Sequence, residues 1–158
     1  MIHADFADFA AALPPYGAVM GLDLGTKTIG VAASDTMRSV ATPITTIRRT
    51  KFTADAEALE RLLAERSVAG IVLGLPLNMD GSGGPRLQST QAFARNLARR
   101  IDTPIAFWDE RLSTVAAERA LLEADATRKR RAQVIDHVAA GYILQGALDR
   151  LRHIGRTP

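Results

Sequence analysis

The chain contains no cysteine among its 158 residues, and this absence excludes several kinds of site. Disulfide bonds, thiolate metal centres and cysteine nucleophiles all need a sulfur atom that is missing. Any metal ion must therefore be held by oxygen atoms or by the 3 histidines. Aromatic residues make up only 5% of the chain, so we expect an aliphatic core.

Long apolar runs are also missing. The longest uncharged apolar run, residues 67–79, contains Pro76 and Asn78 and is shorter than the roughly 20 residues that span a bilayer. The N-terminal residues include Asp5 and Asp8, where a secretory or mitochondrial signal would have lysine or arginine. We therefore expect no membrane-spanning helix and a cytoplasmic protein.

The motifs of several large enzyme classes are absent as well: there is no Walker-type phosphate loop, no GxSxG and no GxGxxG. The composition, 47% hydrophobic and 23% charged, is that of a globular protein. Pro14 and Pro15 end a short segment of helical spacing near the N-terminus. We predict an N-terminal arm over residues 1–16 and one domain over residues 17–158.

Positive charge is concentrated at the C-terminal end of the chain. Residues 128–158 hold 7 basic and 2 acidic side chains, although the net charge of the whole chain is only +3. This clustering favours a polyanionic partner such as nucleic acid. The alternative is that the run Arg128 to Arg131 is simply a solvated loop.

Short apolar segments alternate with segments of helical spacing along the rest of the chain. The expected strands are 18–24, 29–34, 44–47, 70–75 and 105–108, and the expected helices cover 53–66, 86–100, 113–121 and 131–152. Thr53 and Ser113 are candidate N-caps. This order predicts an α/β domain with a mixed sheet, in which three leading strands are antiparallel and helices cover both faces.

Acidic residues occur at three positions where burial would be costly. Asp23 lies inside an apolar strand, Asp109 and Glu110 follow another strand, and Asp136 lies on the apolar side of the last helix. Each has a structural explanation: Asp23 could bind turn amides, Asp109 or Glu110 could cap a helix, and Asp136 could pair with Arg131.

A shared explanation is a divalent cation. Carboxylates that converge on one patch repel each other unless a cation lies between them. Mg²⁺ or Mn²⁺ would suit a site of carboxylate oxygens and water. A metal site beside a basic segment is typical of phosphodiester hydrolysis, because the metal activates water while lysine and arginine hold the strand.

Four stretches resemble motifs of the YqgF family of RuvX-like bacterial nucleases, in the same order. They are GLDLGTKTIGVAASD (21–35), GLPLNMDGSGGP (74–85), DERLST (109–114) and IDHVAAGYILQGAL (135–148). The resemblance runs from about Val19 to Leu148 and implies a ribonuclease H-like fold. It also implies a magnesium-dependent nuclease, which is a hydrolase acting on ester bonds.

Carried over residue by residue, the acids of the family fall on Asp23, Glu110 and Asp136, as catalytic residues and metal ligands. The choice of Glu110 over Asp109 rests on the resemblance alone. Thr28 departs from the family, which often has arginine there, and His137 follows the last acid. The residues that we expect to bind nucleic acid are Lys27, Arg111, Arg128, Lys129 and Arg130.

The resemblance implies processing of the 5′ end of pre-16S rRNA in ribosome biogenesis, or alternatively resolution of Holliday junctions in branched DNA. Expected partners are precursor rRNA or branched DNA and ribosomal precursor particles, with the chain a monomer or a homodimer. Two remoter readings are a non-catalytic RNA-binding module and an actin-like or sugar-kinase-like nucleotide-binding domain. The last is suggested by Asp-Leu-Gly-Thr between two strands, but its cleft needs a second domain.

Overall fold

The computed structural model describes residues 1–78, 80–112 and 128–156, and gives only the backbone for 128–136 and 156. Its elements, in chain order, are β1 (Ile2–His3), α1 (Phe6–Ala12), β2 (Ala18–Leu24), β3 (Thr28–Ser34), β4 (Ala41–Arg48), α2 (Phe52–Glu65), β5 (Val68–Leu75), α3 (Pro85–Ala98), β6 (Ile105–Asp109), the 3₁₀ helix η1 (Glu110–Leu112) and α5 (Arg128–Arg156). The predicted strands and helices are confirmed, all but β2 with changed ends, apart from the predicted helix over 113–121, which lies outside the described residues.

The strands form one mixed sheet in the order β1-β6-β5-β2-β3-β4. As predicted, β2, β3 and β4 are antiparallel neighbours, and β2, β5 and β6 are parallel where helices intervene. Every residue of β2 is buried, because this strand lies at the centre of the sheet and is covered on both faces.

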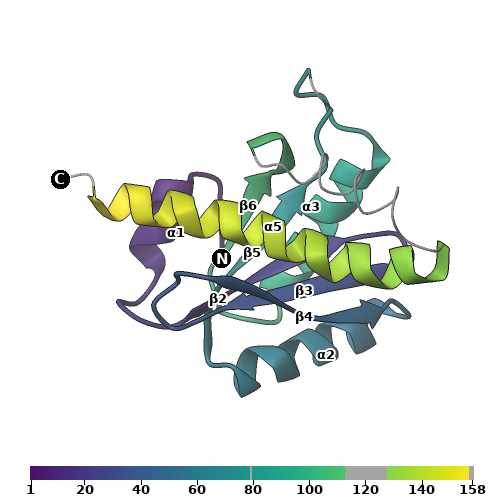
Figure 1. The fold of residues 1–158 in the computed structure, drawn as a ribbon, viewed down its shortest axis with the longest axis horizontal. Coiled ribbons are helices and arrows are strands. Elements are labelled where there is room, and N and C mark those ends of the chain that lie inside the picture. Colours follow the sequence, from purple (N-terminus) through teal and green to yellow (C-terminus); the bar gives the residue numbers. More distant parts are fainter. Residues whose placement is uncertain (79, 113–127, 157–158) are drawn as a thin grey trace.

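Helices cover both faces of the sheet. On one face, α2 and α3 pack on Leu22, Ile29 and Leu73. On the other face, α5 crosses the sheet and packs on Val19, Val72 and the other small apolar residues of the second core, with α1 beside it (Figure 1). None of the helices in the described part of the chain has the length and hydropathy of a membrane span.

The N-terminal residues add a strand that the sequence pattern did not predict. Strand β1 pairs in parallel with β6, with Ile2 opposite Ile105. Phe9 of α1 is completely buried, and a Cβ on Gly70 would lie 2.9 Å from its ring. Residues 1–16 thus pack on the same sheet as the rest of the chain, because the apolar face of α1 needs a surface to cover it.

One predicted helix cap is wrong. Helix α2 begins at Phe52, so Thr53 lies inside the first turn and Lys51 occupies the cap position. Asp55 accepts a hydrogen bond from the backbone N–H of Thr50 at 3.1 Å, which satisfies one of the free amides before the helix. At the start of this helix, the side chain that accepts a backbone hydrogen bond is therefore the buried Asp55 carboxylate and not the Thr53 hydroxyl.

Candidate active site at the carboxyl end of the central strands

Asp23 is buried next to the end of β2, with only 4% of its surface exposed. Side chains alternate along a strand, so Asp23 lies on the same face as Gly21. A Cβ on Gly21 would lie 2.7 Å from Cβ of Leu144 in α5. Asp23 therefore belongs to the face of the sheet that α5 covers.

Glu110 approaches the same place from η1. Its Oε1 lies 2.9 Å from the position that a Cβ on Gly74 would take. Leu22 of β2 pairs with Leu73 of β5, and one further step of this parallel register brings Asp23 level with Gly74. Asp23 and Glu110 thus flank a glycine, whose missing side chain leaves room for the carboxylate of Glu110.

Asp109 has a different environment from its neighbour Glu110. Its Oδ2 accepts a 2.6 Å hydrogen bond from the guanidinium of Arg111, and its Oδ1 accepts one from the Arg111 backbone N–H at 2.9 Å. The Arg111 side chain is the main cause that lowers the pKa of Asp109. The structure therefore separates the two acids: Asp109 is paired with Arg111, and Glu110 extends over Gly74.

Helix α5 brings the third predicted acid to the same side of the sheet. Nδ1 of His137 lies 2.7 Å from Oγ1 of Thr46 in β4. Thr46 pairs with Gly30 of β3, and Gly30 pairs with Asp23. The backbone at Asp136, one residue before His137, therefore lies over the row of residues that contains Asp23. The side chain of Asp136 lies outside the described residues.

The predicted basic residues fall into three groups. Lys27 is exposed in the turn between β2 and β3. Arg111 forms an ion pair with Asp109. Arg128, Lys129 and Arg130 form the first turn of α5, but their side chains lie outside the described residues.

Two further arginines hold the turn that follows Asp23. Nη1 of Arg49 donates a hydrogen bond to the carbonyl oxygen of Gly25 at 2.6 Å, and Nη2 of Arg86 donates one to the carbonyl oxygen of Leu24 at 3.3 Å. Sequence reasoning missed both residues. The basic run 48–51, immediately before a helix, was the available signal for Arg49, whereas nothing local marks Arg86.

Among the side chains that the structure describes, no three histidine, aspartate or glutamate residues form a group that could hold a metal ion. Asp23 and Glu110 contribute oxygen atoms only, which is the donor type that hard divalent cations prefer. Asp23 and Glu110 are therefore two candidate oxygen ligands for such an ion.

The order and direction of the strands define a ribonuclease H-like fold. A solved structure with this fold is Thermus thermophilus RuvC in complex with a Holliday junction substrate (TM-score 0.55, 11% identity, covering 89% of this chain and 97% of that one).

Within this class the chain belongs to the RuvX family, described as Holliday junction resolvase, whose model matches residues 17–150. It is 71% identical over 157 residues to the "Putative pre-16S rRNA nuclease" of Paracoccus denitrificans (strain Pd 1222), and the match covers 99% of each chain. The protein of the same name from Rhodobacter capsulatus is 69% identical over 157 residues, again with 99% coverage of each chain.

Proposed function

We propose that this nuclease processes the 5′ end of pre-16S rRNA, using Asp23, Glu110 and Asp136 as the acids of a divalent-cation site. The observation that carries the proposal is the approach of Glu110 to Gly74, level with Asp23, on the face that α5 covers. Carboxylates brought together in a buried place repel each other. A bound cation removes that repulsion, which explains why the fold tolerates the arrangement.

The three acids come from three different elements: Asp23 from β2, Glu110 from η1 and Asp136 from α5. Mg²⁺ or Mn²⁺ fits because the donors are oxygen atoms. When bound, the ion supplies an activated water and stabilises negative charge on the phosphate. Asp23 and Glu110 belong to elements that pack on one sheet, so little reorganisation of these two acids is needed on binding.

Arg111 and Asp109 support this site without belonging to it. The Arg111 guanidinium is hydrogen-bonded to both oxygens of Asp109, at 3.1 and 2.6 Å to Oδ2 and 3.0 Å to Oδ1. This pairing links the residues on either side of Glu110, which is the first residue of η1. Arg111 is therefore proposed as a positioning residue for Glu110, and its loss should reduce turnover more than affinity.

The name shared by the full-length relatives supports pre-16S rRNA as the substrate. That substrate would put the protein in the cytoplasm, with ribosomal precursor particles as partners. The test is cleavage of a 5′-extended 16S rRNA fragment by purified protein with Mg²⁺, Mn²⁺ or EDTA. We expect cleavage with either metal, none with EDTA, and none by the Asp23→Asn variant. Cleavage in EDTA would contradict the metal site.

The description of the matching family model favours a second candidate, resolution of Holliday junctions. The same assay with a four-way DNA junction in place of RNA separates the two candidates. Symmetric cleavage of the junction, with intact RNA, would favour the resolvase. Binding of RNA without cleavage of either substrate would instead support a non-catalytic RNA-binding module, and retained ATP would support a nucleotide-binding domain.

A further inference from the structure

Three exposed basic residues surround the turn between β2 and β3, next to Asp23. Lys27 lies in the turn, Arg48 ends β4, and Lys51 precedes α2. We call these three residues the turn cluster. Within the described part of the chain, no carboxylate pairs with any of them. Their charges are therefore available to a partner.

Arg48 lies on the same face of the sheet as the acids. Side chains alternate along β4, so Arg48 shares a face with Thr46, which contacts His137 of α5. Ile47, between them, packs into the core on the opposite face. Two strand spacings separate Thr46 from Asp23, which is about 10 Å. Arg48 is therefore exposed at the edge of the sheet on the same face as Asp23.

Other residues keep the turn in place without using these charges. Arg49 donates to the Gly25 carbonyl, lies 4.0 Å from the Asp55 carboxylate and covers the ring of Phe93 at 5.7 Å. Its backbone N–H also donates to the carbonyl of Lys27 at 2.8 Å. The charge of Arg49 is thus used in contacts within the protein. Lys27 and Arg48, which lie next to it, are exposed to solvent.

We propose that the turn cluster binds the phosphate backbone of single-stranded RNA on the β4 side of the cleavage site. This inference rests on the proposed function and adds to it the path of the strand, which would run from Arg48 at the end of β4 past Lys27 in the exposed turn between β2 and β3 toward Asp23. The cluster contains no aromatic residue on which a base could stack, so it positions the strand without reading its sequence.

The test is equilibrium binding of a fluorescein-labelled single-stranded RNA, in EDTA to prevent cleavage, over a salt range from about 0.05 to about 1 M. Each phosphate contact with a single strand contributes about 0.7 to the slope of log K against log salt. The double variant R48A/K51A should therefore lose about 1.4 from the slope and bind about 25-fold more weakly at 0.1 M salt. The loss should nearly vanish toward 1 M salt.

A matched control removes the same charge at the opposite end of the sheet, where β5 and β6 begin. Arg66 and Arg99 are exposed at the C-terminal ends of α2 and α3, and R66A/R99A should keep the wild-type slope. The charge-preserving variant R48K/K51R should also keep it. Because thermal unfolding of each variant is measured in parallel, a binding defect from misfolding would be recognised by a lowered melting temperature and by persistence at high salt.

The outcomes separate this inference from the proposed function. If R48A/K51A had the wild-type slope of log K against log salt and still bound and cleaved RNA, the proposed role of the turn cluster would be overturned. The proposed nuclease activity would be unaffected. Equal losses in R48A/K51A and R66A/R99A would overturn it too, because overall charge would then suffice. A wild-type protein that binds only duplex or branched DNA would overturn both the single-stranded RNA path and the RNA substrate.

Discussion

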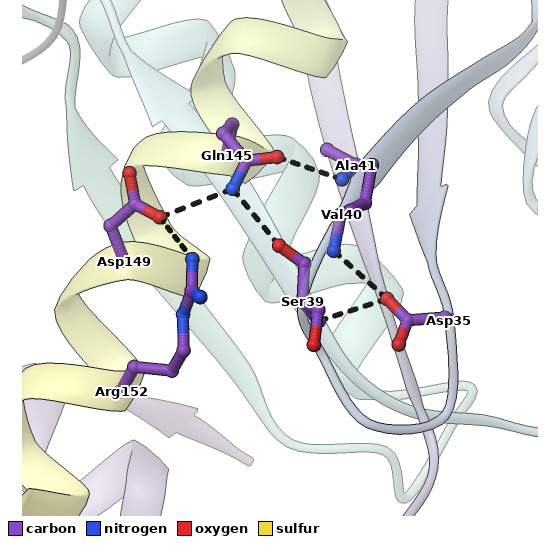
Figure 2. Close-up of polar contacts among 7 residues, drawn as sticks. All are labelled: Asp35, Ser39, Val40, Ala41, Gln145, Asp149 and Arg152. Carbon is purple, nitrogen blue, oxygen red and sulfur yellow. Dashed lines mark hydrogen bonds and ion pairs between the residues drawn. The ribbon is translucent and has the colours of Figure 1, made fainter.

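The polar side chains at the two ends of the sheet differ in how far they are paired within the protein. At the end away from the site, the turn between β3 and β4 is held to α5 by a closed set of hydrogen bonds (Figure 2). Oδ1 of Asp35 accepts from the N–H groups of Ser39 and Val40, and Gln145 bonds the backbone of Ser39 and Ala41. Asp149 accepts from both Gln145 and Arg152.

At the site end, acids approach one another and exposed lysine and arginine lack carboxylate partners among the described residues. Glu110 reaches Gly74 level with Asp23, while Lys27 and Arg48 stay exposed. Polar groups at the first end mainly stabilise the fold, whereas we propose that those at the second end bind a cation and a polyanion. The difference teaches that unbalanced charge, more than polarity as such, marks the functional end.

The largest expected effect separates two neighbouring acids. Glu110→Gln should lower the cleavage rate by about 10³-fold, because a metal ligand contributes several kcal/mol to stabilising the transition state. Asp109→Asn leaves the charge of Glu110 in place. It should lower the cleavage rate far less, because Asp109 pairs with Arg111 and is not one of the proposed metal ligands. Single-turnover cleavage of the rRNA fragment measures both. Equal losses would remove the distinction between the two acids.

The next effect concerns the glycine between the acids. Gly74→Ala would place a Cβ 2.6 Å from Cδ1 of Ile143 and 2.9 Å from Oε1 of Glu110. We expect a loss of about 1–3 kcal/mol of stability from overpacking. The cleavage rate should also fall more than about tenfold, because displacing the Glu110 carboxylate by 1 Å or less is enough for an effect of that size. The control Gly84→Ala meets no atom within 4 Å. Full activity of Gly74→Ala would place Glu110 outside the reaction.

A smaller effect tests the crowding of the acids through stability. In the metal-free protein, Asp23→Asn should raise the melting temperature, because it removes a buried charge from beside Glu110. Mg²⁺ should then raise the melting temperature of the wild type more than that of the variant. Scanning calorimetry with Mg²⁺ and with EDTA measures both shifts. A lower melting temperature of the metal-free variant would support a structural role for Asp23.

The smallest effect belongs to the opposite end. The hydrogen bond from the Val40 N–H is the main cause that lowers the pKa of Asp35 in the folded protein. A lowered carboxylate pKa stabilises the fold above the unfolded pKa, and that contribution disappears as the pH falls through the folded pKa. The stability difference between wild type and Asp35→Asn, from urea unfolding, should therefore be larger at neutral pH than in acid. A pH-independent difference would contradict this.

Much of the fold was readable from the sequence because its signals are local. The buried strand β2 is apolar apart from Asp23, and its predicted ends are those of the structure. Strand β1 escaped notice because two residues show no periodicity, and its partner β6 lies a hundred residues away. The start of α2 was misplaced because the group that serves it, Asp55, lies inside the helix and bonds back to Thr50.

The sequence by itself determined the alternation of strands and helices, the absence of thiol chemistry, and the presence of carboxylates where apolar residues were expected. Only the tertiary structure decided which of these charges meet. The register of β2 on β5 brings Asp23 level with Gly74, and the turn after β6 sends Glu110 to the same point while Arg111 retains Asp109. Periodicity is a property of consecutive residues, whereas a site depends on distances between strands and helices that are far apart in the chain, and packing sets those distances.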